Sequence, residues 1–257
     1  MAEDNVRSYI VGHRGAGNSA PGSTMSALSK AAELGLGWVE FDVRLTADNH
    51  LVIANADDLF ECSGQAIKIS ETCLDDLLKV DVGHSYQKTN DIHRIPLFED
   101  AVKFCIDHNI RTQIELKAEV GKERVLALAI IDCLNSDDLA FSAGREPLIT
   151  SFSSECLMAV NDYSEKSLDT GLLIHTHLAN DWEEVANTVD PKYVHFYGGA
   201  IDDGVRLTDK FGQSVQDAGY LLNAYKVNSQ QDAKAAINAG AQRFTSDEPE
   251  LLLGLER

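Results

Sequence analysis

The chain has 257 residues, of which 44% are hydrophobic, and a formal net charge of −19. This length allows one large α/β domain or two small ones, and the charge argues against a nucleic acid or an anionic membrane surface as a partner. No apolar run reaches the ~18 residues of a membrane span, and the acidic stretch Met1 to Asn5 is unlike a signal peptide. We therefore expect a soluble, cytoplasmic protein without a membrane span.

Short apolar runs alternate with amphipathic helical segments along the whole chain. We predict strands over residues 9–11, 38–43, 112–116, 148–152, 171–175, 193–197, 220–225 and 242–245. Apolar residues recur at helical spacing over 98–106, 182–189 and 233–237, the last ending near Gly240. Strands that alternate with helices in this way predict the α/β class and a (β/α)8 TIM barrel. No Pro/Gly-rich linker divides the chain, so we expect one domain over residues 1–257.

Two segments break this alternation. Residues 51–55 look like a strand but follow Asp42 too closely for a crossover helix. A reversal near Asp48 and Asn49 makes this segment a hairpin partner of the preceding strand and brings Asn55 close to Asp42. Residues 57–95 then form a small insertion near the barrel mouth, with a helical piece over 71–79 and a polar loop over 88–93.

The five cysteines are scattered, odd in number and free of C-x-x-C spacing. This pattern argues against a disulfide framework and against a zinc knuckle. Cys105 and Cys133 belong to apolar helical patterns, so we expect them to be buried thiols.

Three carboxylates are expected at the C-terminal ends of strands, where functional groups gather in such barrels. Glu40 and Asp42 are two residues apart in one strand, so both side chains point to one face. Glu115 ends another strand. Three oxygen donors suit Mg²⁺ or Ca²⁺ better than Zn²⁺, which prefers His and Cys. Any one of these acids alone would be read as a solvated residue, but together they predict a divalent metal site.

One histidine and two cations join these acids. His13 follows the first strand and is a candidate general acid or base. Arg14, beside it, would hold a phosphate oxygen. Lys117 lies one alternation beyond Glu115 on the same face and would neutralise phosphate charge in a transition state.

These motifs resemble those of the glycerophosphodiester phosphodiesterase family. That family belongs to the phosphodiesterase barrels of the phosphatidylinositol-specific phospholipase C type. The resemblance covers nearly the whole chain. The family's His-Arg-Gly, Glu-x-Asp and Glu-x-Lys match His13-Arg14-Gly15, Glu40-Phe41-Asp42 and Glu115-Leu116-Lys117, with weaker echoes at Ser151-Phe152 and Thr245-Ser246-Asp247-Glu248-Pro249.

The resemblance implies a hydrolase of lipid and glycerol metabolism that converts small-molecule glycerophosphodiesters to glycerol 3-phosphate and an alcohol, using a divalent cation. It implies metal binding by Glu40, Asp42 and Glu115. It also implies catalysis by His13 and Lys117, and substrate binding by Arg14, Lys117 and Tyr225, the last in place of a family Trp.

The chain departs from the family at two further places. The family's Pro-Glu-Asn-Thr is Pro21-Gly22-Ser23-Thr24 here, which removes a carboxylate and an amide. Asn55-Ala56 replaces its His-Asp, so the position of the second catalytic His holds a side chain that cannot deliver a proton. Losing a general acid typically costs about 10²–10⁴-fold in rate.

Two functions of different classes stay open at this point. One is a metal-dependent phosphodiesterase weakened at Asn55. The other is a catalytically impaired module that binds or senses glycerophosphate-like ligands. A replacement acid is open too, although each candidate is more readily explained as a surface or core residue: His84, His93, His175, His177 and His195. The sequence does not predict the head-group alcohol, the preferred cation or the oligomeric state.

Overall fold

The strands form a closed barrel. The computed structural model describes residues 8–86, 91–165, 167–175, 181–199 and 207–254. The ring closes because β1 pairs in parallel both with β9 and with β2. Its parallel strands are β1 (Ile10–Gly12), β2 (Trp38–Leu45), β4 (Arg111–Leu116), β5 (Leu148–Ser151), β6 (Thr170–Leu173), β7 (Tyr193–Tyr197), β8 (Leu221–Tyr225) and β9 (Phe244–Ser246). The predicted (β/α)8 barrel is confirmed.

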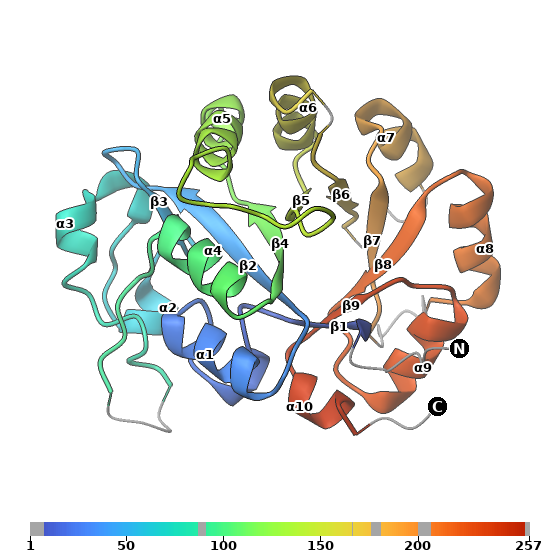
Figure 1. Cartoon of the computed structure of the whole chain (residues 1–257), viewed down its shortest axis with the longest axis horizontal. Helices are drawn as coiled ribbons and strands as arrows, with labels where there is room; N and C mark the ends of the chain where they lie inside the picture. Colours follow the sequence, from blue (N-terminus) through green and yellow to red (C-terminus); the bar gives the residue numbers. More distant parts are fainter. Residues whose placement is uncertain (1–7, 87–90, 166, 176–180, 200–206, 255–257) are drawn as a thin grey trace.

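Helices surround this ring (Figure 1). They are α1 (Met25–Glu33), α4 (Phe98–Asp107), α5 (Glu123–Leu134), α6 (Ser154–Tyr163), α7 (Trp182–Val189), α8 (Asp209–Asp217), α9 (Gln230–Asn238) and the short α10 (Pro249–Leu252), with a 3-10 turn η2 (Gly17–Ser19). The helices predicted from apolar spacing are confirmed as α4, α7 and α9, and Gly240 follows α9 with φ +85°.

Some strand boundaries differ from the prediction. β2 runs to Leu45 rather than to Val43, because Val43 to Leu45 pair with the hairpin partner β3. β6 begins one residue early and ends at Leu173, which leaves His175 in the segment beyond the strand. β1 and β9 begin and end one or two residues later than expected.

The hairpin is confirmed. β3 (Leu51–Ile53) pairs antiparallel with β2, and the backbone N–H of Ala54 donates to the carbonyl oxygen of Asp42 at 3.0 Å. The chain then enters the insertion, which lies beside α1 and α4 (left in Figure 1). It contains α2 (Phe60–Ser63), η3 (Ile69–Glu71) and α3 (Leu74–Leu77). These pieces enclose a small core of their own: Val52, Ala54, Leu59, Ile69, Leu77, Val80, Val82 and Ile95.

The helical piece predicted over residues 71–79 is present but shorter, as α3. Thr72 and Cys73 both have extended backbone conformations, so they separate η3 from α3. Of the predicted loop over 88–93, residues 88–90 lie outside the described residues, and 91–93 have no regular secondary structure.

Side-chain alternation in β2 positions the site. Val39, Phe41 and Val43 belong to the core between barrel and helices. Trp38, Glu40 and Asp42 therefore point to the barrel interior. Trp38 packs there with residues of β1, β5 and β7 and closes the barrel below the carboxylates. The two acids therefore lie inside the barrel above an apolar floor.

None of the helices in the described part of the chain is long and apolar enough to cross a membrane. All five cysteines are free. Burial raises the pKa of the Cys105 thiol to about 12 and that of Cys133 to about 11. These two thiols therefore stay protonated. Cys105 is buried as expected, whereas Cys133 is only half-buried.

Candidate active site

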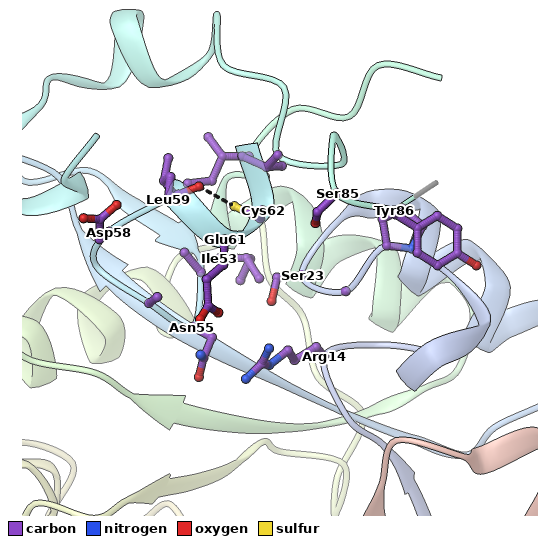
Figure 2. A pocket seen from close by; sticks show the side chains of 16 residues that line it. Arg14, Ser23, Ile53, Asn55, Asp58, Leu59, Glu61, Cys62, Ser85 and Tyr86 are labelled. Carbon is purple, nitrogen blue, oxygen red and sulfur yellow. Dashed lines mark hydrogen bonds between the residues drawn. The ribbon is translucent and has the colours of Figure 1, made fainter. Parts of the chain in front are cut away.

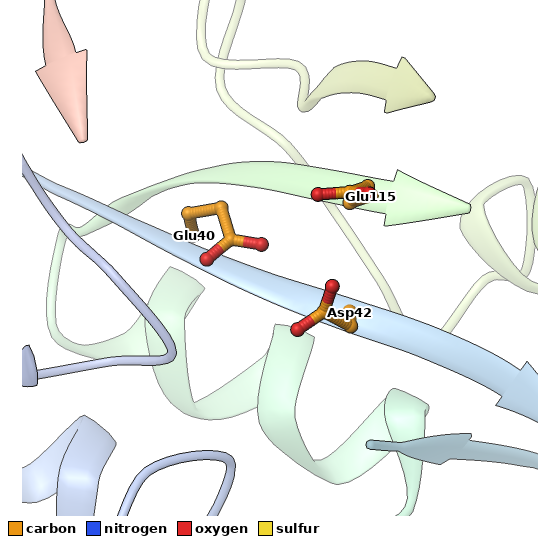
Figure 3. Close-up of side chains that lie close together, drawn as sticks. All are labelled: Glu40, Asp42 and Glu115. Carbon is orange, nitrogen blue, oxygen red and sulfur yellow. The ribbon is translucent and has the colours of Figure 1, made fainter. Parts of the chain in front are cut away.

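The three predicted metal ligands meet at one point of the barrel mouth (Figure 3). β2 and β4 pair in a register that sets Asp42 opposite Glu115, and Glu40 lies one alternation earlier in β2. One carboxylate oxygen from each of the three lies within 4.8 Å of the others. Glu40, Asp42 and Glu115 are only 2%, 1% and 8% exposed. Burial of so many like charges is costly unless a cation compensates them.

The electrostatics of this cluster fit a divalent cation. Oε1 of Glu40 and Oδ2 of Asp42 are buried and have no hydrogen-bond partner among the described residues. Burial, and then the charge of Asp42, raises the pKa of Glu40 well above its usual range and that of Glu115 to about 7. Such hard, unpaired oxygens are the donor set that Mg²⁺ and Ca²⁺ take.

Two cations flank the carboxylates. Arg14 Nε lies 3.7 Å from Asp42 Oδ2, and Lys117 Nζ lies 3.3 Å from Asp42 Oδ1 and also pairs with Glu115. Burial alone would lower the pKa of Lys117, but the charges of Glu115 and Asp42 raise it above its usual value. Lys117 therefore remains charged next to the cluster.

His13 is held by a carboxylate that the sequence reasoning did not assign to it. Its Nδ1 contacts Oδ1 of Asp247, while Nε2 faces the cluster, 3.8 Å from Glu40 Oε2. Asn228 fixes Asp247 by donating from Nδ2 to Oδ2 at 3.0 Å and accepting the Asp247 backbone N–H at 2.8 Å. Burial would raise the pKa of Asp247, but the bonds to His13 and Asn228 hold it well below its usual range.

The turn after β1 aims His13 and Arg14. A Cβ at Gly12 would lie 2.0 Å from the carbonyl oxygen of Gly15, so only glycine fits this turn. Arg14 has a left-handed backbone conformation, with φ +52°. Its backbone N–H donates to Glu40 Oε2 at 3.0 Å, and Gly15 donates to the Glu40 carbonyl oxygen at 3.0 Å. Hydrogen bonds therefore join the turn to Glu40, a member of the carboxylate cluster.

Asn55 lies in a cavity of about 320 Å³ between the barrel mouth and the insertion (Figure 2). Arg44 Nε fixes the Asn55 backbone by donating to its carbonyl oxygen at 3.0 Å. The described lining is Arg14, Pro21, Gly22, Ser23, Ile53, Ala54, Asn55, Ala56, Asp58, Leu59, Glu61, Cys62, Val82, Ser85, Tyr86 and Ile95. This lining contains no imidazole, so none of the candidate histidines in the described part of the chain borders the cavity beside Asn55.

Aromatic rings form the opposite side of the mouth. The ring of Tyr225 meets that of Phe152 edge to face at 5.7 Å, and its hydroxyl donates to the carbonyl oxygen of Ile174 at 2.5 Å. Lys117 Nζ lies 5.6 Å from the centre of the Phe152 ring, and His175 stacks on the same ring at 4.2 Å. Phe152 therefore lies between Tyr225 and Lys117, at the edge of the carboxylate cluster.

The histidines of the insertion lie elsewhere. His93 is buried, and its Nδ1 bonds to Ser26 Oγ at 3.1 Å, which ties the insertion to α1. His84 is exposed and is absent from the described lining of the Asn55 cavity. Both agree with the structural roles expected for them.

The histidines of later strands divide into two kinds. His195 is fully buried inside the barrel, where burial lowers its pKa to about 3 and Asn223 Nδ2 lies 3.3 Å from its Nε2. It is therefore a neutral core residue. His175 is exposed at the mouth, against Phe152. His177 lies outside the described residues.

Comparison with known proteins gives a consistent result. The model of the Glycerophosphoryl diester phosphodiesterase family matches residues 13–251. A glycerophosphodiester phosphodiesterase of Caldanaerobacter subterraneus subsp. tengcongensis is 25% identical over 257 residues, 98% of this chain and 99% of that protein.

Two solved structures share the fold. A phosphodiesterase of Oleispira antarctica, solved in complex with the product sn-glycerol-3-phosphate, has a TM-score of 0.82 at 24% identity and covers 95% of this chain and 94% of its own. A glycerophosphodiester phosphodiesterase of Thermotoga maritima has a TM-score of 0.70 at 21% identity, with coverage of 96% and 98%.

Proposed function

The chain belongs to the glycerophosphoryl diester phosphodiesterase family, and from this membership we propose that it hydrolyses glycerophosphodiesters to glycerol 3-phosphate and an alcohol. The observation that carries the proposal is the buried cluster of Glu40, Asp42 and Glu115 with His13, Arg14 and Lys117 around it. Such a cluster combines a metal site, a base and phosphate-binding cations within one barrel mouth. The Caldanaerobacter relative is named a glycerophosphodiester phosphodiesterase, which supports the same activity here.

Glu40, Asp42 and Glu115 would hold the cation, Mg²⁺ or Ca²⁺. When bound, such a cation polarises the phosphate and offsets the charge of the three carboxylates. Arg14 and Lys117 add positive charge on either side of Asp42. They would orient the phosphate and stabilise the charge that develops on its oxygens in the transition state.

His13 would act on the attacking hydroxyl. Asp247 accepts the Nδ1 proton, which leaves the lone pair of Nε2 facing the cluster. In this tautomer His13 can take at Nε2 the proton of the nucleophile, either the substrate's own glycerol hydroxyl or a water molecule, as a new P–O bond forms and the P–O bond to the leaving alcohol breaks. The departing alkoxide takes a proton from solvent water. Where the glycerol hydroxyl attacks, a second water then opens the cyclic phosphate to glycerol 3-phosphate. The charge of Asp247 stabilises the imidazolium that forms. This division of labour makes Asp247 a positioning residue.

The position of Asn55 provides no imidazole to protonate the leaving alcohol. Asn55 occupies the position at which the family resemblance implies the second histidine. An amide cannot donate a proton to an alkoxide, so release of poor leaving groups would be slow. This position favours the second candidate function, a module that binds glycerophosphate-like ligands without turnover.

Leaving-group dependence separates the two candidate functions. A phosphodiesterase without its acid is expected to cleave an activated aryl diester of glycerol phosphate much faster than an alkyl one, because a phenolate leaves without protonation. Product release from both diesters would be measured in the presence of Mg²⁺ and of Ca²⁺. Cleavage of neither diester with either cation favours the binding module.

Replacement of Asp247 by Asn is expected to lower kcat about 100-fold with little change in KM. The amide can donate to Nδ1 and so favours the wrong tautomer, with the Nε2 proton pointing at the site. Initial rates on the aryl diester measure the effect. Asp132→Asn, at an exposed position of α5, is a matched control. An Asp247→Asn rate within a factor of about two of wild type would exclude the positioning role.

Cation binding is expected to change how stability depends on pH. Without a cation, the folded protein keeps Glu115 protonated up to its pKa of about 7, whereas the unfolded chain loses that proton near about 4.3. The folded state thus binds more protons between these values, and the free energy of unfolding falls as the pH rises from about 4.5 to 7. Cation binding to the ionised carboxylates reverses this loss.

Thermal unfolding at pH 5 and pH 7.5, with and without Mg²⁺ or Ca²⁺, measures this linkage. The cation is expected to raise the melting temperature more at the higher pH, and to do so much less in Glu115→Gln. Glu71→Gln, an exposed residue that pairs with Lys68, provides the control. Equal shifts in wild type and Glu115→Gln would contradict the assignment of the metal site.

A further inference from the structure

The cavity beside Asn55 carries a charge pattern that the phosphate chemistry does not use. Its charged lining residues in the described part of the chain are Arg14, Asp58 and Glu61. Arg14 belongs with the phosphate, since it lies 3.7 Å from Asp42 of the metal cluster. Two carboxylates remain in a cavity that opens from an anion-binding site. Both belong to exposed residues, and neither can bind the phosphate, because like charges repel.

Glu61 is the carboxylate that remains available to a ligand. It lies on α2, and in Figure 2 its carboxylate points toward the side chains of Asn55 and Arg14. No hydrogen bond or ion pair joins it to another described residue. Asp58 differs, because its Oδ1 accepts the backbone N–H of Phe60 at 2.8 Å.

The neighbouring thiol lies beside the same two carboxylates. Cys62 follows Glu61 and lines the cavity. Burial raises the pKa of this thiol, and the charges of Glu61 and Asp58 raise it further. The same negative charges that disfavour a thiolate would attract a cation placed in the cavity.

Given the proposed phosphodiesterase function, on which this inference rests, we propose that the cavity holds the alcohol half of the substrate and that Glu61 selects alcohols bearing a primary ammonium group. The phosphate of such a diester lies at Arg14 and the metal cluster. Its ammonium group, a few bonds away, then reaches the carboxylate on the insertion. The two ends of the cavity thus match the two charges of a zwitterionic diester.

The other lining groups favour a primary over a quaternary ammonium. Ser23 Oγ is buried without a hydrogen-bond partner in the described structure, and Asn55 and Ser85 offer further oxygens to the cavity. An N–H donor can use these oxygens, whereas a quaternary ammonium has no N–H and is bound chiefly by aromatic cages. The described lining contains a single aromatic ring, that of Tyr86.

The test compares kcat/KM for three glycerophosphodiesters, those of ethanolamine, choline and the uncharged alcohol glycerol. Wild type is expected to prefer the ethanolamine diester. Glu61→Gln keeps the shape of the side chain but removes its charge, so we expect the preference for ethanolamine over glycerol to fall about tenfold. Glu71→Gln removes one charge from the same insertion outside the described cavity lining and is expected to leave the preference unchanged.

Several results would overturn the inference. If Glu61→Gln cleaves the ethanolamine and glycerol diesters in the wild-type ratio, Glu61 does not select the ammonium, although the proposed phosphodiesterase function stands. If the choline diester is preferred and responds equally to Glu61→Gln, the primary-ammonium selectivity is wrong. If neither wild type nor Asn55→His cleaves any diester, the aryl diester included, the phosphodiesterase function fails and this inference fails with it.

Discussion

Asn55→His is expected to raise the rate of glycerol 3-phosphate release from alkyl glycerophosphodiesters by about 100-fold. The side chain at this position lines the cavity of about 320 Å³ that also contains Arg14, so an imidazole has room beside the phosphate site. There it can protonate the departing alkoxide, which the amide cannot. The gain is expected to be small for the aryl diester, whose leaving group needs no proton.

Rates on both diesters measure this prediction. Asn135→His, an exposed position at the end of α5, adds an imidazole far from the cavity and is expected to change neither rate. An equal rise on the alkyl and aryl diesters in Asn55→His would contradict an acid role at this position. A wild-type enzyme already fast on alkyl diesters would mean that another group supplies the proton, and the exposed His175 at the mouth is then the first residue to mutate.

His13→Gln is expected to lower kcat on the aryl diester by about 10³-fold. Glutamine preserves a polar side chain beside Asp247 but cannot accept a proton at the position of Nε2. Because the carboxylates remain, cation binding is expected to survive. The variant therefore separates proton transfer from metal binding within one site.

The control for His13 is His108, which is exposed and bonds to the carbonyl oxygen of Phe104 in its own helix. His108→Gln is expected to keep the wild-type rate. Cation-dependent thermal stabilisation of His13→Gln, measured in parallel, shows whether the fold and the metal site are intact. If His13→Gln retains more than about a tenth of wild-type kcat, another group is the base.

The parts of the site that local sequence rules describe were predictable. Glu40 and Asp42 share a face because strand side chains alternate, and Glu115 follows from the strand ends of a barrel. The hairpin that brings Asn55 to the mouth was predicted because too few residues separate Asp42 from the next strand for a crossover helix. The pairing of β3 with β2 confirms it.

Other parts depend on contacts that no local pattern contains. His13 and Asp247 are 234 residues apart and meet only because β1 and β9 close the ring. Asp247 stood in a recognisable motif, but nothing in the sequence linked it to His13. The structural role of His93 likewise depends on a distant contact, its hydrogen bond to Ser26 on α1. The helical piece predicted over 71–79 begins only at Leu74 for a local reason, the extended conformations of Thr72 and Cys73.

The most direct test of the proposed metal-dependent hydrolysis is release of glycerol 3-phosphate from an aryl glycerophosphodiester by wild type and by Glu115→Gln, with Mg²⁺ or Ca²⁺ and after chelation. We expect wild type to release it only with the cation, and we expect the rate to fall by at least about 10²-fold in Glu115→Gln. Release that is indifferent to both chelation and Glu115→Gln would contradict the metal site. Absence of release from wild type and from Asn55→His alike would contradict the phosphodiesterase function and leave a binding module.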